Sequence, residues 1–232
     1  MKKYHVKCDA PMEIASHQGE YTVVTVSQKQ QPGGFEHFGD NVKFIGYSKA
    51  GSSIPDKERN IIFVSLGTLC KSKSFWNKCL LATKDLGYNV VFVLGGNSMD
   101  NIDQKLINEH VTIHTSVSLA EYEDYIQRSV LFINHGGMNS ITMSLYYKTP
   151  VLVCPNSTEQ HENGKAVKRN NCGNTYKNQK ITVKQLKNQI ESIIHSDSIA
   201  NSLIECSNDL NNSIGFEKIA KDIITSFNLS EL

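Results

Sequence analysis

The sequence lacks any long apolar run: no segment approaches the ~20 consecutive apolar residues that a helix needs to cross a bilayer. The start, "MKKYHVKCDAPMEI", has a basic pair but no apolar block behind it, so we expect no secretory signal and a cytoplasmic protein. Net charge is only +1, and the sequence contains neither a long Lys/Arg run nor an aromatic RNA-binding motif. Neither a membrane span nor a nucleic-acid partner is therefore expected.

Paired metal-ligand motifs are also missing. The six cysteines are scattered, with no C-x-x-C spacing, at Cys8, Cys70, Cys79, Cys154, Cys172 and Cys206. Free thiols in a reducing compartment fit this pattern better than disulfides or a zinc site. His135, His161 and Glu162 include no pair at the i,i+4 spacing of a helical zinc motif, and no D-x-D motif occurs. We therefore expect no metal and no other cofactor.

What the sequence does contain, from residue 60 onward, is an alternation of short β-rich runs with helical patterns. Strands are predicted at 61–67, 89–96, 111–117, 130–136, 150–155 and 174–177. Helices are predicted at 74–87, 101–109, 118–129, 137–148, 158–171, 182–195, 197–208 and 214–228. Near-continuously apolar strands that alternate with helices indicate an α/β fold, a Rossmann-like parallel sheet with helices on both faces.

The first part of the chain does not follow this rhythm. Residues 1–58 contain two strand-like runs, 21–27 and 42–47, joined and followed by loop-like sequence. We therefore divide the chain into a linker-like N-terminal segment, 1–58, and a Rossmann-like domain, 59–232.

Four of the predicted strands end in polar tips rich in Gly, Ser or Thr: "SLGT" (65–68), "LGGNS" (94–98), "NHGGMNS" (134–140) and "PNSTEQ" (155–160). The carboxyl ends of parallel strands meet at one edge of the sheet, where such folds bind their ligands over helix N-termini. We therefore expect these tips to share one rim and to hold the ligand.

The tip "HGGMNS" has the composition of an anion site. Gly136 and Gly137 let the backbone come close to a ligand, and the free N–H groups of the following helical turn would face it. His135, Asn139 and Ser140 can add side-chain donors. Ordinary helix capping, in which the two glycines only form a tight turn, is the alternative that the hexapeptide alone leaves open.

Other catalytic motifs are absent. An esterase oxyanion hole also contains "HGG", but that chemistry needs a G-x-S-x-G elbow, and "GYSKAG" (46–51) has the wrong spacing. The dinucleotide fingerprint G-x-G-x-x-G and the Walker loop G-x-x-x-x-G-K-[ST] do not occur.

Two further tips are weaker signals. In "PNSTEQ", the carboxylate of Glu159 and the amide of Gln160 suit bidentate hydrogen bonding to vicinal sugar hydroxyls, although acids also favour the first turn of any helix. In "SLGT", Gly67 allows a close approach and Thr68 offers a hydroxyl, although a plain strand-to-helix turn has the same composition.

Taken in order, the motifs resemble a known family. "VSLGT", "INHGGMNSITMSLYYKTPVLVCP" and "NSTEQHENGKAVKRNNCG" closely resemble the C-terminal, donor-binding half of nucleotide-sugar-dependent glycosyltransferases of the two-Rossmann-domain (GT-B) fold. The most similar group is that of the bacterial macrolide and UDP-glucosyl/glucuronosyl transferases. The resemblance covers roughly residues 20–228.

The resemblance implies a role for each matching residue. Residues near the donor phosphates would be Ser65, Gly67 and Thr68, and those that hold the diphosphate would be His135, Gly136, Gly137, Asn139 and Ser140. Glu159 and Gln160 would bind the sugar hydroxyls, and the backbone of Val117 would contact the nucleobase. The expected donor is a UDP-sugar, although Ser118 and Leu119 replace the Pro-Gln pair that the family often has there.

The family's N-terminal domain binds the acceptor and supplies the catalytic base, and no histidine of this chain stands where that base would be. The resemblance therefore implies the donor half of an inverting hexosyltransferase that needs an acceptor-binding domain or subunit for full activity. The alternatives are a non-catalytic module of the same fold that acts in assembly or regulation, and a sugar-nucleotide epimerase.

Overall fold

The computed structural model describes residues 21–30, 39–68, 72–176 and 181–227. Six strands form one parallel sheet in the spatial order β5-β4-β3-β6-β7-β8. Their bounds are β3 (Ile61–Ser65), β4 (Asn89–Val93), β5 (Val111–His114), β6 (Ser129–Asn134), β7 (Val151–Val153) and β8 (Gly173–Thr175). The Rossmann-like sheet expected from the sequence is confirmed.

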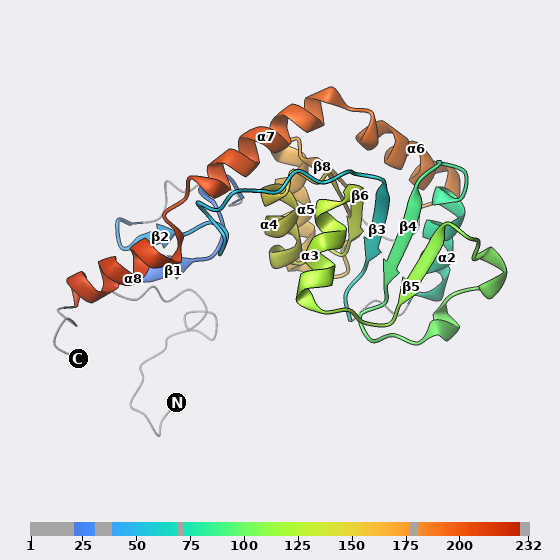
Figure 1. Ribbon diagram of the computed structural model, residues 1–232, viewed down its shortest axis with the longest axis horizontal. Coiled ribbons are helices and arrows are strands. Elements are labelled where there is room, and N and C mark those ends of the chain that lie inside the picture. Colours follow the sequence, from blue (N-terminus) through green and yellow to red (C-terminus); the bar gives the residue numbers. More distant parts are fainter. Residues whose placement is uncertain (1–20, 31–38, 69–71, 177–180, 228–232) are drawn as a thin grey trace, which may run out of the picture.

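Helices cover both faces of this sheet. Figure 1 shows α3 in front of the sheet and α2 behind it. On one side α3 packs on α4 and α4 on α5, while α2 packs on α6. The helix bounds are α2 (Lys73–Thr83), α3 (Leu119–Gln127), α4 (Met138–Tyr146), α5 (Thr158–Arg169), α6 (Val183–Ile194), α7 (Asp197–Asn211) and α8 (Gly215–Ser226).

The two central strands carry the core between these layers. All five residues of β3 are buried, and so are five of the six in β6. Phe63 and Phe132, on these adjacent strands, stack with ring centroids 4.7 Å apart. Each buried Phe contributes roughly 1.5–3 kcal/mol relative to an exposed one, so this stacked pair stabilises the contact between β3 and β6.

Polar caps fix where several helices begin. The capping box expected at the start of α3 is present: Ser118 Oγ accepts the N–H of Glu121, and the Glu121 carboxylate accepts the N–H of Ser118. Thr182 and Gln185 form the same box at the start of α6.

The helix predicted at 101–109 is wrong. That region instead contains two 3-10 turns, η3 (Met99–Asn101) and η4 (Gln104–Leu106), separated by Ile102 and Asp103, both in an extended conformation. The side chains of Ser98 and Asp103 accept the N–H groups of Asp100 and Lys105. These local side-chain bonds cap the start of two separate short turns, and the extended backbone between the turns keeps them from joining into one helix.

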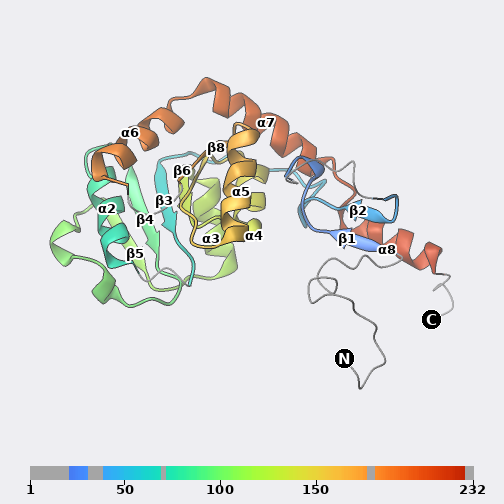
Figure 2. The same cartoon turned by 180° about the vertical axis from the view of Figure 1, so that it is seen from behind.

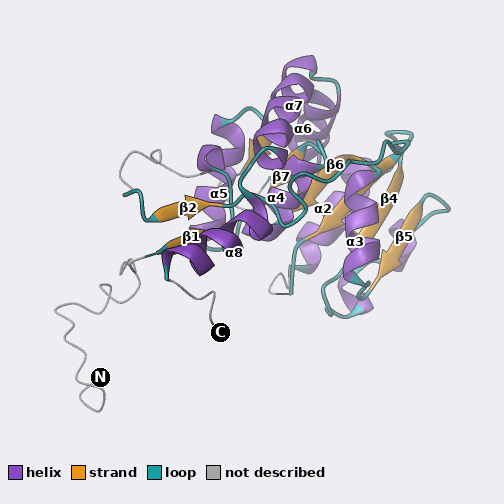
Figure 3. Ribbon diagram, turned by 60° about the vertical axis from the view of Figure 1, so that its left-hand side comes forward, coloured by secondary structure: helices purple, strands orange, loops and turns teal. Residues whose placement is uncertain are grey.

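The N-terminal segment forms a small sheet of its own, in which β1 (Thr22–Val24) is parallel to β2 (Val42–Phe44). The 3-10 turn η2 (Gln28–Gln30) lies between these two strands in the sequence. In Figure 2, α7 runs from α6 towards this pair of strands, and Figures 2 and 3 show α8 beside the pair. The N–H of Gly215 donates to the carbonyl of Ile45 (3.3 Å), which links the start of α8 to the residue after β2. The division at residue 58 stays a prediction.

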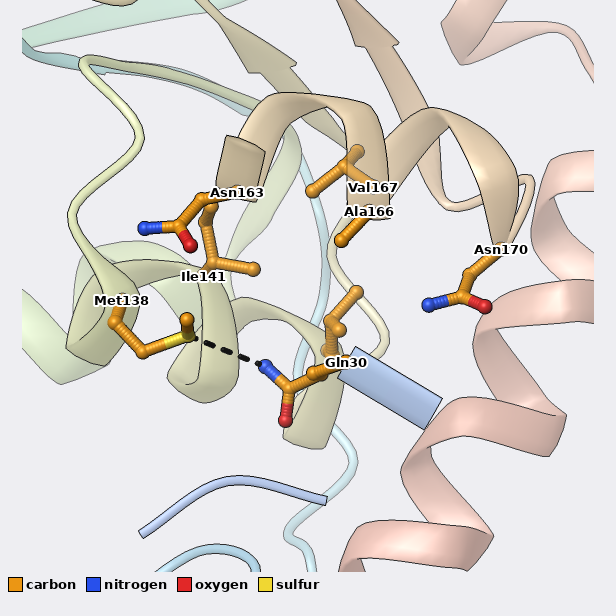
Figure 4. A pocket seen from close by; sticks show the side chains of 8 residues that line it. Gln30, Met138, Ile141, Asn163, Ala166, Val167 and Asn170 are labelled. Atoms are coloured by element: carbon orange, nitrogen blue, oxygen red, sulfur yellow. Dashed lines mark hydrogen bonds between the residues drawn. The ribbon is translucent and has the colours of Figure 1, made fainter. Parts of the chain in front are cut away.

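Gln30 anchors this segment to the helices of the main domain. Its Oε1 accepts the N–H of Ser27 (3.0 Å), and its Nε2 donates to Oγ1 of Thr142 on α4 (2.9 Å). Figure 4 shows Gln30 reaching between α4 and α5, with its amide 3.9 Å from the Met138 sulfur. The cavity that remains has a volume of only about 10 Å³, enough for about one water, so it is a packing contact rather than a ligand site.

Some predictions fall outside the described residues: the free thiols of Cys8 and Cys70, residue 177 of the last strand and residue 228 of the last helix. Cys79, Cys154, Cys172 and Cys206 are buried thiols outside any disulfide, as expected. Within the described ranges, none of the helices combines the length and the apolar character that a bilayer crossing requires.

Candidate functional site

The candidate site lies where the strand order reverses. β3 has β4 on one side and β6 on the other, and the next connections lead outward in opposite directions. In the β3–β6 register Ser65 is opposite Asn134, so "SLGT" and "NHGGMNS" leave the sheet side by side. A crevice at such a switch point is the usual ligand site of an open parallel sheet.

The turn from β6 into α4 requires glycine at position 136. Gly136 has φ +93, a conformation that disfavours any side chain, and a Cβ there would lie 2.7 Å from Cγ1 of Val153 and 2.9 Å from the carbonyl oxygen of Gln160. The turn is therefore packed tightly against β7 and α5. Asn134 holds it from the other end, since its Oδ1 accepts the N–H of Gly136 (2.7 Å).

The N-terminus of α4 is open. Its N-cap is Gly137, which has no side chain to accept the first N–H groups. By contrast, Ser118, Ser157 and Thr182 cap α3, α5 and α6 with their hydroxyls. The unpaired N–H groups of the first turn and the positive end of the helix dipole can therefore meet an anion.

His135 stands between the two strand tips, with its imidazole enclosed by glycines. A Cβ on Gly67 would lie 2.9 Å from the ring's Cε1, and one on Gly137 would lie 2.7 Å from Nε2. Burial lowers the pKa of His135, and a hydrogen bond to the Ser65 backbone and the nearby carboxylate of Glu159 offset this only in part. The ring is therefore neutral near pH 7 in the unliganded chain, and its single N–H can bond either the Ser65 backbone or a ligand.

Five of the predicted site residues line one pocket. This open pocket has a volume of about 350 Å³ and is bounded by His135, Gly137, Met138, Asn139, Ser140 and Glu159. It joins the N-terminus of α4 to the first turn of α5, so that hydrogen-bond donors gather at one end and a carboxylate stands at the other. Such a surface can accept a molecule that has both an anionic group and hydroxyl groups.

The other predicted residues are not in the lining of this pocket. Ser65 is buried, Thr68 is exposed on the loop after β3, and Val117 is half-buried between β5 and α3. Gln160 is buried, and its Oε1 already accepts the N–H of Asn156 (2.8 Å). Only the Nε2 group of Gln160 therefore remains as a donor for a ligand.

The tip after β4 supports the loop that carries Gly67. A Cβ on Gly95 would lie 2.9 Å from the backbone carbon and oxygen of Gly67, so the two loops touch through their main chains. Asn97 donates from Nδ2 to the carbonyl of Leu94 (2.6 Å) and more weakly to that of Gly67 (3.4 Å). The role of 94–98 in this structure is thus to position 65–68.

Sequence reasoning missed Tyr122 of α3. Its hydroxyl lies 3.3 Å from Oγ of Ser140, and the hydroxyl of Ser65 also interacts with it. Tyr122 packs edge-on against Phe63 and Phe132, and burial raises its pKa. The helical spacing of Tyr122 and Ile126 could have placed it on the buried face of α3, but no motif shows that this face ends beneath the pocket.

A family model supplies the identification. Residues 72–223 match the C-terminal domain of glycosyltransferase family 28. The chain belongs to this family. The relationship predicted from the motifs is confirmed, since the matched domain is the C-terminal one and contains the "HGGMNS" and "EQ" tips.

Individual relatives agree with this family. The chain is 29% identical to YojK of Bacillus subtilis, described as an uncharacterized UDP-glucosyltransferase, over 230 residues that make up 95% of this chain and 55% of the relative. It is 26% identical to the NDP-glycosyltransferase YjiC of the same organism, over 81% of this chain and 49% of the relative. The chain thus spans about half the length of the curated relatives it matches.

A solved structure shows the same fold. The calicheamicin glycosyltransferase CalG4 superposes with a TM-score of 0.78 at 18% identity, over the whole of this chain and 58% of its own. The chain therefore has the architecture of one half of a GT-B glycosyltransferase.

Proposed function

We propose that this chain binds a UDP-sugar and forms the donor half of an inverting glycosyltransferase, which moves a hexose to an acceptor hydroxyl. The observation that carries the proposal is the pocket at the start of α4, where open helix N–H groups, His135 and Glu159 surround one space at the switch point of the sheet. The UDP-glucosyltransferase named among the relatives favours uridine as the base.

Each end of the pocket suits one part of such a donor. The N–H groups of Met138, Asn139 and Ser140 would bind the diphosphate, together with the imidazole N–H of His135. The carboxylate of Glu159 would accept hydrogen bonds from sugar hydroxyls, with Nε2 of Gln160 beside it. The backbone of Val117, on the same rim, would meet the base, and Ser65, Gly67 and Thr68 would border the phosphates.

The same groups would stabilise the charge that develops during transfer. The acceptor oxygen attacks the anomeric carbon as the bond from that carbon to the diphosphate oxygen breaks, and the electron pair of this bond leaves with UDP. Helix N–H groups and His135 would meet this growing negative charge. In this proposal they, and not a metal ion, have that role. A base outside this chain would remove the proton of the acceptor hydroxyl.

This chain spans only about half the length of its relatives. We therefore place the acceptor-binding surface and the base on an additional domain or subunit, and expect the chain alone to bind the donor with little or no transfer.

Calorimetric titration of the chain with UDP and with UDP-glucose tests the proposal. Saturable binding of both is expected, and His135→Ala should weaken it by roughly tenfold, the effect of losing one charge-assisted hydrogen bond. The control is His110→Ala, because His110 is an exposed histidine far from the rim. No heat at millimolar UDP would refute the proposal and would favour a non-catalytic role in assembly or regulation.

A further inference from the structure

One buried amide joins the two ends of the pocket. Nδ2 of Asn163, on α5, donates to the carbonyl oxygen of Gly136 (2.8 Å) and to Oε1 of Glu159 (3.0 Å). Asn163 is 5% exposed. Figure 4 shows its nitrogen pointing away from Gln30 and from the packing contact between α4 and α5. A single side chain therefore contacts both the glycine turn below α4 and the carboxylate at the start of α5.

The chemistry of the amide matches these two partners. A carboxamide nitrogen has two N–H donors, and here each donor has one acceptor. With Asn134 Oδ1 on the N–H of Gly136 and Asn163 Nδ2 on its carbonyl, asparagines hold that residue from both sides. Glu159 itself is exposed, and an exposed Glu on a helix samples several rotamers unless a bond holds it.

We infer that Asn163 is a positioning residue, which fixes the Glu159 carboxylate relative to the diphosphate turn and so determines how well the sugar of a bound donor is recognised. This inference rests on the proposed function. It predicts that the loss of Asn163 weakens the binding of a UDP-sugar more than that of UDP, because UDP has no hexose for Glu159 to contact.

A double-mutant cycle measures this effect. Dissociation constants for UDP and UDP-glucose are determined by calorimetry for wild type, Glu159→Ala, Asn163→Ala and the double variant. Asn163→Ala should raise the ratio of the UDP-glucose constant to the UDP constant by several-fold. In the Glu159→Ala background, the same substitution should leave that ratio unchanged, because the carboxylate that Asn163 orients is gone.

A matched control lies at the C-terminal end of the same helix. Asn170 also donates its amide to a backbone carbonyl, that of Lys29 (2.9 Å), but it lies away from the pocket. Asn170→Ala should change neither constant. Asn163→Leu is the second variant if Asn163→Ala does not fold, because leucine fills a similar volume but has no N–H or O–H to donate to either acceptor, and the same ratio change is expected.

The outcomes distinguish the positioning role of Asn163 from the proposed binding of a UDP-sugar. If wild type binds both ligands and Asn163→Ala shifts the ratio equally with and without Glu159, or not at all, the positioning role is overturned while the proposed function stands. If wild type binds neither ligand, the proposed function fails and the positioning role fails with it.

Discussion

The imidazole of His135 occupies the space into which a side chain at Gly67 would point: a Cβ there would be 2.9 Å from Cε1 of the ring. The two residues come from different strand tips, 65–68 after β3 and 134–140 after β6. Glycine at position 67 is thus needed for the placement of His135 as well as for its own backbone, which has φ +70.

Gly67→Ala should therefore reduce both stability and ligand binding. A left-handed conformation costs an L-residue about 1–2 kcal/mol, and the new methyl group would also displace the ring of His135. We expect a lower melting temperature and UDP binding weakened by roughly tenfold, as for the loss of one hydrogen bond to a charged group. Thermal unfolding and calorimetry measure the two effects.

Gly87→Ala separates these effects. Gly87 also has positive φ (+76), but a Cβ there meets nothing within 4 Å. It should show a similar loss of stability and no loss of UDP affinity. Equal affinities for UDP in both variants would show that Gly67 does not determine the position of His135.

Acidification should destabilise the protein partly through His135. Burial lowers the pKa of His135 below the ordinary value of 6.5. Between the lowered pKa and 6.5 the unfolded chain binds more protons than the folded chain, so stability rises with pH through this window and falls on acidification. The urea midpoint of wild type should drop more between pH 7 and pH 5 than that of His135→Gln. Parallel pH profiles for the two proteins would contradict this expectation.

Much of the fold could be predicted because its signals are local. Near-continuous apolar runs such as 61–67 and 130–136 indicate strands buried on both faces, and a parallel sheet follows from their alternation with helices. The shared rim then follows from strand direction, so that His135, Asn139, Ser140 and Glu159 could be expected near one another. Their roles in binding stay predictions.

What could not be predicted depends on contacts between distant segments. Asn163 and Tyr122 read as ordinary helix residues, and only the packing of α5 and α3 against the start of α4 brings them to the pocket. Sequence periodicity also predicted a helix at 101–109. The spacing of apolar residues does not show that the side chains of Ser98 and Asp103 accept backbone N–H groups and cap two separate turns. Likewise, the engagement of Gln160 by Asn156 could not be seen in the motif.

Glu123 should contribute to stability by joining the N-terminal segment to the main domain. Its carboxylate accepts hydrogen bonds from Lys49 (2.6 Å), Tyr147 and Tyr47 (3.3 Å). Burial would raise the pKa of Glu123, but the bonds from Lys49 and Tyr147 outweigh it and lower that pKa. Glu123→Ala should lower the free energy of unfolding by about 2 kcal/mol, below the range for fully buried pairs because Lys49 is half exposed.

The matched control for this substitution is Glu109→Ala, since the Glu109 side chain is 83% exposed. Urea unfolding of the two variants compares them directly. If Glu123→Ala lowers the free energy of unfolding no more than Glu109→Ala does, hydrogen bonds from the three donors to water are as favourable as those to the carboxylate.

Tyr122→Phe should weaken UDP binding without disturbing the core. The substitution keeps the ring that packs against Phe63 and removes only the hydroxyl beside Ser140. Ser140 then loses a partner that orients its Oγ in the pocket, and a neutral hydrogen bond of this kind contributes about 1 kcal/mol. We expect UDP affinity to fall by several-fold in calorimetry, with little change in melting temperature.

Tyr125→Phe is the control on the same helix. Tyr125 bonds through its hydroxyl to Nε2 of His114 (3.0 Å), outside the pocket, and it also packs against Phe63. Both variants lose one hydroxyl from α3, so a general weakening of that helix would affect them alike. If Tyr122→Phe and Tyr125→Phe bind UDP equally well, Tyr122 supports the fold but does not orient Ser140 for the ligand.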